Sequence, residues 1–274
     1  MKVVPEPLTL VMFLAAAFVV VVIYMGYRVS VESGEQAKRD LATERDLRTL
    51  AATNGWSYRK GTNRLSTLAW RIEGKTAAGR DFSLESHYSS APAADSSGNA
   101  TSRMVWNCAD LPGRSSAAFT LTSTRTVEVA RGKLASAFLA GTARVLGKVS
   151  EAFGGSVEKS AQAIGFTQLI SEAPLIPLEA LGERWRIAAH DEALVRHIFD
   201  PELCAELAGL PRIKLSNVDT DDALWLIYDS RGVSFELGFI EIIDGLEVIM
   251  PQSDLARAAL SIGGKVAERL ASDR

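Results

Sequence analysis

The chain has 274 residues, of which 47% are hydrophobic and 23% are charged, and its formal net charge is −3 at pH 7. These proportions exclude a wholly disordered chain, a collagen and a coiled coil, and the near-neutral charge excludes a strongly basic nucleic-acid-binding protein. The 2 cysteines exclude a disulfide-rich scaffold, and the length allows one or two small domains.

A long apolar segment near the N-terminus predicts a membrane-spanning helix. Residues 8–25 contain no charged side chain, and their one polar side chain is Thr9. With Gly26 and Tyr27 the segment reaches about 20 residues, the length at which a helix crosses the hydrocarbon of a bilayer. A cleaved signal peptide is the alternative, although its apolar core is shorter and follows a basic start. We therefore assign residues 1–27 as a transmembrane anchor.

Basic residues on the two flanks of this segment predict its orientation. Only Lys2 precedes the segment, whereas the residues shortly after it include Arg28, Lys38, Arg39, Arg45 and Arg48. Because basic flanks stay in the cytoplasm, we expect the N-terminus outside and the large C-terminal part in the cytoplasm.

The residues after the anchor predict a helical linker and then a first α+β lobe. Residues 28–55 form the linker, whose charged helix ends at Asn54-Gly55. Residues 56–155 form the lobe, with alternating strands at 68–72 and 82–88 around a turn at Thr76–Gly79. We expect a mobile loop at 89–102, strands at 104–108 and 119–129, and a long helix at 131–153.

Basic residues accumulate in this first lobe. Residues 1–153 hold 19 basic and 13 acidic side chains, whereas residues 154–274 hold 11 and 20. The cluster comprises Arg59, Lys60, Arg64, Arg71, Lys75 and Arg80. One hypothesis is a surface that contacts anionic lipids, where each basic group contributes about 1 kcal/mol. The alternative is a set of solvated strand faces without a lipid role.

Residues 156–274 predict a second, acidic α+β lobe. After a connection at 156–177, a strand contains Trp185, a short helix covers 191–199, and Asp200-Pro201 begins a further helix. Strands at 213–215, 224–228, 233–239 and 246–250 precede a final helix that Ser253 caps. The short hairpin connections predict mainly antiparallel sheets. The expected fold class is therefore α+β, with packed helices in two lobes.

Four segments carry a resemblance to known proteins. They are NGWSY (Asn54–Tyr58), WRIEG (Trp70–Gly74), GRDFSLES (Gly79–Ser86) and the segment 184–207. Together they resemble uncharacterised bacterial proteins that join one N-terminal membrane helix to a domain of unknown function. The resemblance implies a single-pass protein of the bacterial inner membrane, and it supplies no catalytic residues.

Motifs for catalysis, cofactors or metals are incomplete or absent. The segment 261–266 lacks the first glycine of a phosphate-binding loop and has Val266 in place of its Ser or Thr. No GxSxG, HExxH or CxxC pattern occurs. We therefore assign no cofactor, no metal site and no catalytic residue. His190 and His197 are capping or surface histidines, or candidates for a hydrolase site if a cleft brings a carboxylate to them.

Together these observations predict a membrane-anchored binding or adaptor module on the cytoplasmic face. Its expected partners are the lipid bilayer and an unidentified protein, and nucleic acid is excluded. The alternatives are a lipid or small-ligand sensor with a pocket between the lobes, and a hydrolase-type enzyme around His190 and His197.

Overall fold

The computed structural model describes residues 38, 40–61, 68–88, 100–111, 117–131, 168–210, 214–215, 218–219, 224–241 and 252–272. The chain divides into two units, residues 1–48 and 49–274, and a helix over residues 40–53 runs across that division. Among the described residues, no helix combines the length and the apolar character needed to cross a bilayer. The span expected at residues 8–25 lies outside the described residues.

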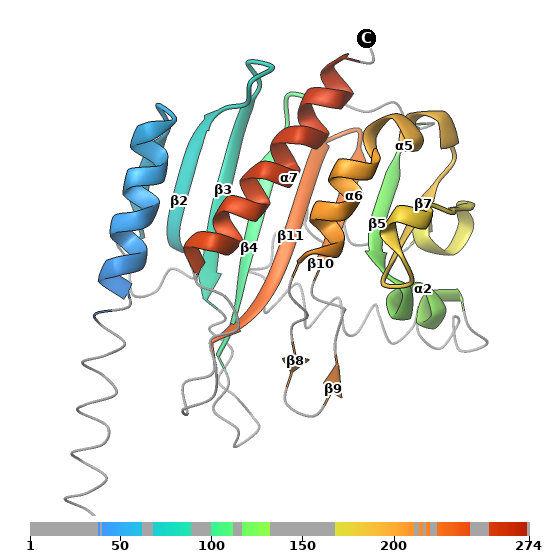
Figure 1. Ribbon diagram of the computed structural model, residues 1–274, viewed down its shortest axis with the longest axis horizontal. Helices are drawn as coiled ribbons and strands as arrows, with labels where there is room; N and C mark the ends of the chain where they lie inside the picture. The colour runs from blue at the N-terminus through green and yellow to red at the C-terminus, as the bar shows by residue number, and fades with distance from the viewer. Residues whose placement is uncertain are drawn as a thin grey trace, which may run out of the picture. The chain divides into compact units, whose positions relative to one another are not determined.

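A nine-stranded sheet is the centre of the second unit (Figure 1). In spatial order its strands are β1 (Ser57–Lys60), β2 (Leu68–Lys75), β3 (Asp81–Tyr88), β4 (Ala100–Cys108), β11 (Gly232–Glu241), β10 (Leu224–Asp229), β5 (Phe119–Ser123), β7 (Trp185–Ala189) and β6 (Leu175–Ile176). Every neighbouring pair is antiparallel. Strands β8 (Lys214–Leu215) and β9 (Val218–Asp219) form a separate antiparallel pair. The predicted α+β class with antiparallel pairing is confirmed.

Strands from both expected lobes lie in this one sheet. Strand β4 pairs with β11, and β5 lies between β10 and β7. The expected boundary at residues 155 and 156 therefore does not separate two sheets. Hairpin signals predicted the local pairs β2–β3 and β10–β11, but pairing between distant segments leaves no such local signal.

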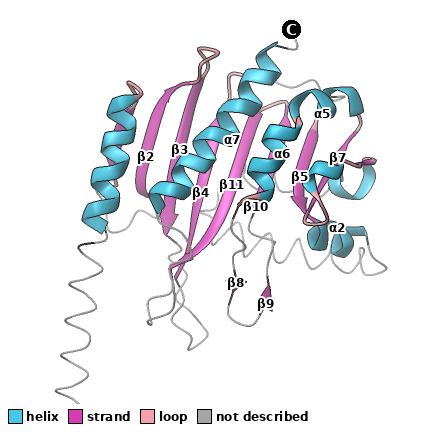
Figure 2. Ribbon diagram, in the orientation of Figure 1, coloured by secondary structure: helices cyan, strands magenta, loops and turns pink. Residues whose placement is uncertain are grey.

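Because side chains alternate along a strand, every second residue of the sheet faces the side that the helices cover. Ile72, Leu84 and Trp106 are opposite one another on β2, β3 and β4, and all three are buried. Helix α7 (Gln252–Ser272) packs on β3, β4 and β11, in front of the sheet in Figure 2. It approaches closely because Gly263 lies against the Trp106 ring, where a Cβ would come within 2.7 Å of three ring carbons. The neighbouring strand positions face the other side of the sheet.

Shorter helices complete the second unit. They are α2 (Thr124–Arg131), η2 (Glu179–Leu181), α5 (Glu192–Ile198) and α6 (Pro201–Ala208). The Asp191 side chain caps α5 by accepting from Leu194 N, and Asp200 caps α6 by accepting from Leu203 N. The sequence predicted the start of α6 from Asp200 as its cap and Pro201 at its first position, and the structure confirms both.

Two segment predictions need correction. The strand expected at 119–129 ends at Ser123, and α2 follows at once. Thr124 begins that helix, and its backbone N–H still donates to Arg184 O, one position beyond the last residue pair of β5 and β7. Residues 100–102 of the loop expected at 89–102 belong instead to β4, because β11 supplies a partner for each residue from 100 to 108, and residues 89–99 lie outside the described residues. The expected helix 131–153 and strand 246–250 lie outside the described residues, apart from Arg131.

Candidate functional site

Charged side chains line the face of β1, β2 and β3 that is turned away from α7. Arg59, Arg71 and Glu85 are opposite one another in the register, and Glu73 and His87 follow by alternation on the same face. We call these five residues the charged strip.

The members of the charged strip pair with one another both along and across the strands. Arg71 lies 2.7 Å from Glu73 and 3.1 Å from Glu85, measured from Nη2 to Oε1 and from Nη1 to Oε1. His87 Nε2 lies 2.9 Å from Glu85 Oε2, and Arg59 Nε lies 3.9 Å from Glu73 Oε2. Adjacent Arg59 and Arg71 would repel each other without these carboxylates. In the order in which these contacts link them, Arg59, Glu73, Arg71, Glu85 and His87 alternate between basic and acidic side chains.

Exposure varies strongly along the charged strip. The Arg59 side chain is 76% exposed and that of His87 only 13%. Exposed ion pairs contribute little to stability, about 0–1 kcal/mol each. Arg71 Nε is buried and has no hydrogen-bond partner among the described residues. An unpaired buried donor is costly, so the strip is not arranged for maximum stability.

The six basic residues of the lipid-surface hypothesis do not form one patch. Arg59, Arg71 and Lys75 lie on the strip side, whereas Lys60 is opposite Trp70 and therefore faces the other side. Arg80 lies in the turn before β3, and Arg64 lies outside the described residues. Glu73, Glu85 and Asp81 each lie within 4 Å of one of the three strip-side cations. Their negative charges offset those cations, and the lipid-surface hypothesis stays a prediction.

A shallow pocket lies where β1 begins and the β2–β3 turn bends back. It has a volume of about 510 Å³ and is lined by Asn54, Gly55, Trp56, Glu73, Gly74, Lys75, Asp81 and Phe82. Asn54 and Gly55 belong to the expected linker and the other six residues to the first expected lobe, so this pocket is not the one expected between lobes. We call it the Trp56 pocket.

The Trp56 ring is held in place on several sides. It packs on Gly74, where a Cβ would lie 2.6 Å from the indole Cγ, so a larger residue would displace the ring. Its Nε1 donates to Lys75 O at 3.2 Å, and its ring meets Phe82 edge-on at 5.1 Å between centroids. Trp56 is nevertheless only half-buried. The result is a fixed aromatic surface beside solvent.

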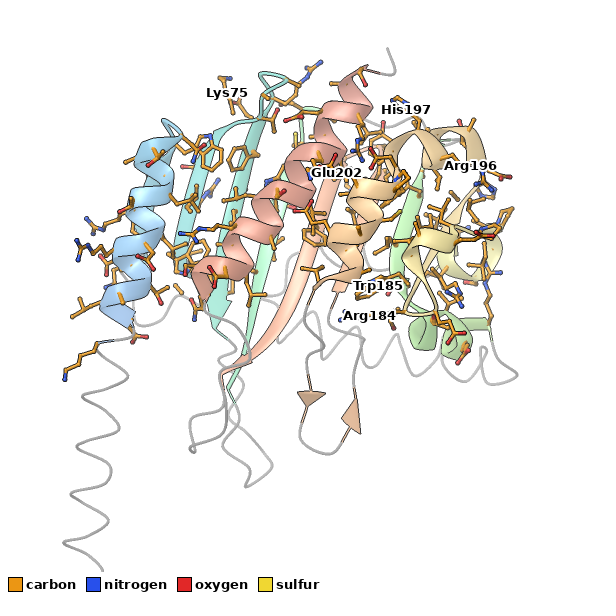
Figure 3. The ribbon with its side chains drawn as sticks, viewed as in Figure 1. Lys75, Arg184, Trp185, Arg196, His197 and Glu202 are labelled. Atoms are coloured by element: carbon orange, nitrogen blue, oxygen red, sulfur yellow. The ribbon has the colours of Figure 1, made fainter. Side chains whose placement is uncertain are left out.

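Polar groups of the Trp56 pocket are mostly paired. Lys75 Nζ lies 2.7 Å from Asp81 Oδ1, and Glu73 is held by Arg71 as described above. Asn54 donates its amide N–H to Leu50 O, which leaves the amide oxygen as an acceptor. Figure 3 shows Lys75 at the β2–β3 turn. Pairing leaves the pocket close to electrically neutral.

The two histidines considered for a hydrolase site lie elsewhere. His190 and His197 are both exposed, and neither lines the Trp56 pocket. His197 is in the last turn of α5 (Figure 3), with Nε2 3.5 Å from Ser272 Oγ. In the part of the chain that the structure describes, no three His, Cys, Asp or Glu side chains are grouped as a metal site requires. The hydrolase hypothesis for these two histidines therefore stays a prediction.

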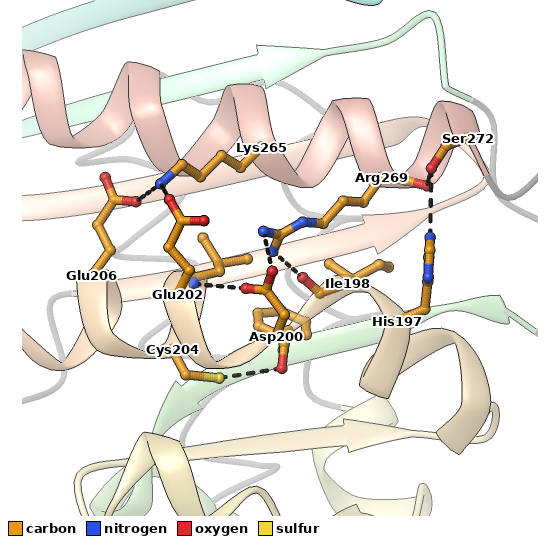
Figure 4. Close-up of polar contacts among 11 residues, drawn as sticks. His197, Ile198, Asp200, Glu202, Cys204, Glu206, Lys265, Arg269 and Ser272 are labelled. Carbon is orange, nitrogen blue, oxygen red and sulfur yellow. Dashed lines mark hydrogen bonds and ion pairs between the residues drawn. The ribbon is translucent and has the colours of Figure 1, made fainter.

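A second group of charges joins α5 and α6 to α7 (Figure 4). Lys265 Nζ lies 2.8 Å from both Glu202 Oε1 and Glu206 Oε2, and these contacts raise the lysine pKa. Arg269 donates to Ile198 O and lies 2.6 Å from Asp200 Oδ2. Each contact joins one helix to another, so we interpret this group as structural.

The two cysteines are also structural. Cys108 and Cys204 are buried free thiols, and Cys204 Sγ donates to Phe199 O at 3.4 Å. Burial raises the pKa of Cys108, and it raises that of Cys204 to about 11. A nucleophilic cysteine needs a lowered pKa and solvent access, so neither residue has that character.

Comparisons with known proteins give no relative of this chain. No family model, curated protein or solved structure matches it. The resemblance to uncharacterised bacterial membrane proteins therefore stays a prediction. Function has to follow from the charged strip and the Trp56 pocket, neither of which was visible as a unit in the sequence.

Proposed function

We propose that the protein is a membrane-anchored binding module, held in a bacterial inner membrane with its folded part in the cytoplasm. The charged strip supports the binding role in this proposal, and the apolar segment and its basic flanks in the sequence support the anchor and its orientation. It places three cationic or titratable groups and two carboxylates on one face of a rigid sheet. A fixed row of charges on a rigid platform is suited to select a partner with the complementary row.

The balance of charge favours a protein partner over a lipid surface. An anionic membrane attracts a surface with excess positive charge. On the strip side, however, Glu73, Glu85 and Asp81 accompany Arg59, Arg71 and Lys75. Alternating signs match another protein surface better, because each charge there can face its opposite.

Site-specific photo-crosslinking in the native host tests the proposal. A benzoyl-phenylalanine replaces Ser83, which is opposite Glu73 on the strip side, and a control replaces the exposed Ala205 on α6. We expect a light-dependent adduct to a protein from position 83 and none from position 205. Arg59→Glu reverses the most exposed charge of the strip and should reduce the adduct several-fold. Arg196→Glu, an exposed change on α5, is the matched control.

The outcomes separate the possible partners. An adduct that Arg59→Glu weakens and Arg196→Glu leaves intact supports a protein partner at the charged strip. An adduct to lipid at position 83 would show that this face contacts the membrane and not a protein, and it would support the lipid-surface hypothesis. Equal labelling at positions 83 and 205, or none at position 83, would contradict a binding role for this face.

A further inference from the structure

We infer that the Trp56 pocket binds a neutral saccharide ring. This inference extends the proposed binding role to a second ligand, and it does not depend on the partner of the charged strip. Its volume of about 510 Å³ lies in the range of small-molecule sites, which span roughly 300–1,000 Å³.

The aromatic wall defines one side of the ligand. Trp56 is fixed by Gly74, Phe82 and its hydrogen bond to Lys75 O, and the residue is half-buried and lines the pocket. A ring so constrained contacts a ligand without losing side-chain freedom on binding. A flat ligand face with C–H groups, such as one face of a sugar ring, buries apolar area against the indole.

The paired charges that line the pocket indicate a ligand without net charge. Lys75 and Asp81 neutralise each other at 2.7 Å, and Glu73 is neutralised by Arg71 at 2.7 Å. A cationic or anionic ligand would lose water there without gaining a counter-ion, and that loss is costly. A hydroxyl group both donates and accepts hydrogen bonds. It can therefore accept from the Lys75 ammonium and donate to the Asp81 carboxylate or to the Asn54 amide oxygen. An apolar face edged with hydroxyls is the chemistry of a saccharide.

Fluorine NMR of the full chain in phosphatidylcholine nanodiscs tests the inference. The chain has 5 tryptophans, so 5-fluorotryptophan labelling reports each one, and Trp56→Phe identifies the Trp56 resonance. The probes are maltotriose and chitotriose at millimolar concentration. Choline chloride and sodium phosphate at matched ionic strength are the charged comparisons. In a further arm, the nanodiscs contain monoglucosyl diacylglycerol, which distinguishes a lipid head group from a soluble sugar.

We expect a saturable shift of the Trp56 resonance with a saccharide, soluble or lipid-borne, and none with choline or phosphate. Lys75→Ala and Asp81→Asn should weaken the apparent affinity several-fold, whereas Arg196→Ala, on α5, should leave it unchanged. No saccharide shift, or an equal shift with choline, would overturn the inference. The crosslink at position 83 should persist in Trp56→Phe if the charged strip has a partner, and the Trp56 shift should persist in the absence of that partner, so either proposal can fail while the other holds.

Discussion

Two neighbouring glycines in α7 offer a matched test of how closely this helix approaches the sheet. A Cβ on Gly263 would lie within 2.7 Å of Cε2 and Cε3 of Trp106, whereas a Cβ on Gly264 would meet nothing within 4 Å. The Trp106 ring has little room to retreat, because it is buried and stacks on Phe82 at 6.0 Å between centroids. Gly263→Ala should therefore force the helix and the sheet apart, and Gly264→Ala should not.

The two substitutions share one effect and differ in another. In a helix interior, alanine is more favourable than glycine by about 1 kcal/mol, and both variants gain this. Overpacking a well-filled core costs about 1–3 kcal/mol, and only Gly263→Ala incurs that cost. We expect Gly264→Ala to be stabilising by about 1 kcal/mol. The variants should thus differ by about 1–3 kcal/mol in unfolding free energy, with Gly263→Ala the less stable.

Thermal unfolding of both full-length variants in nanodiscs, followed by tryptophan fluorescence, measures this difference. For a chain of this size 1 kcal/mol moves the unfolding temperature by about 2–4 °C. Gly263→Ala should unfold at least a few degrees below Gly264→Ala. Equal unfolding temperatures for the two variants would refute the close contact between α7 and β4.

Further predictions concern topology, acid stability and thiol reactivity. A reporter that works only in the cytoplasm should be active when fused after Arg274, and one that works only outside should be inactive; the reverse result would contradict the orientation inferred from the flanking basic residues. The hydrogen bond from Leu203 N, and then the Arg269 guanidinium, hold the pKa of the Asp200 carboxyl below its usual value of 3.8. The stability that Asp200 contributes is therefore complete above about pH 4 and is lost as pH falls through the folded-state pKa. Asp200→Asn should make the urea midpoint less dependent on pH below about 4, and an unchanged dependence would contradict this role. Neither Cys108 nor Cys204 should react with a thiol reagent at pH 8 until the chain unfolds, since burial raises both pKa values; rapid labelling of the folded chain would contradict their burial.

Local signals in the sequence predicted local structure well. The alternation around Trp70 and Phe82 and the turn at Thr76–Gly79 predicted the β2–β3 hairpin, and Gly79 has the positive φ, 75°, of such a turn. The aspartate cap and proline of α6 predicted its first residue. What the sequence did not predict is which distant strands pair. Strand β5 lies between β10 and β7, and no hairpin or spacing rule specifies that arrangement.

The candidate site was predicted only in part, for a related reason. Along the sequence, residues 56–80 hold Arg59 and Arg71 among six basic residues, and Glu73 as their one acidic residue. The sheet register adds Glu85 from the next strand, and that carboxylate changes the character of the surface from basic to alternating. The sequence did not indicate a pocket at Trp56, because whether a tryptophan is buried or half-buried depends on what packs around it. Gly74 leaves the space that the Trp56 ring occupies. The two residues meet only because β1 pairs with β2, and no local pattern in the sequence joins them.

Glu73 connects the charged strip to the Trp56 pocket. It lines the pocket and also lies 2.7 Å from Arg71 in the strip. A ligand hydroxyl that donates to Glu73 competes with Arg71 for the same carboxylate, which frees the guanidinium for an acidic group on a protein partner. Binding at the two sites would then be coupled, and thermodynamic linkage requires that each ligand change the affinity of the other by the same factor. The sign of that coupling follows from the geometry: saccharide binding should strengthen the partner complex, and Glu73→Gln, which weakens the pairing with Arg71 in advance, should reduce the coupling toward zero.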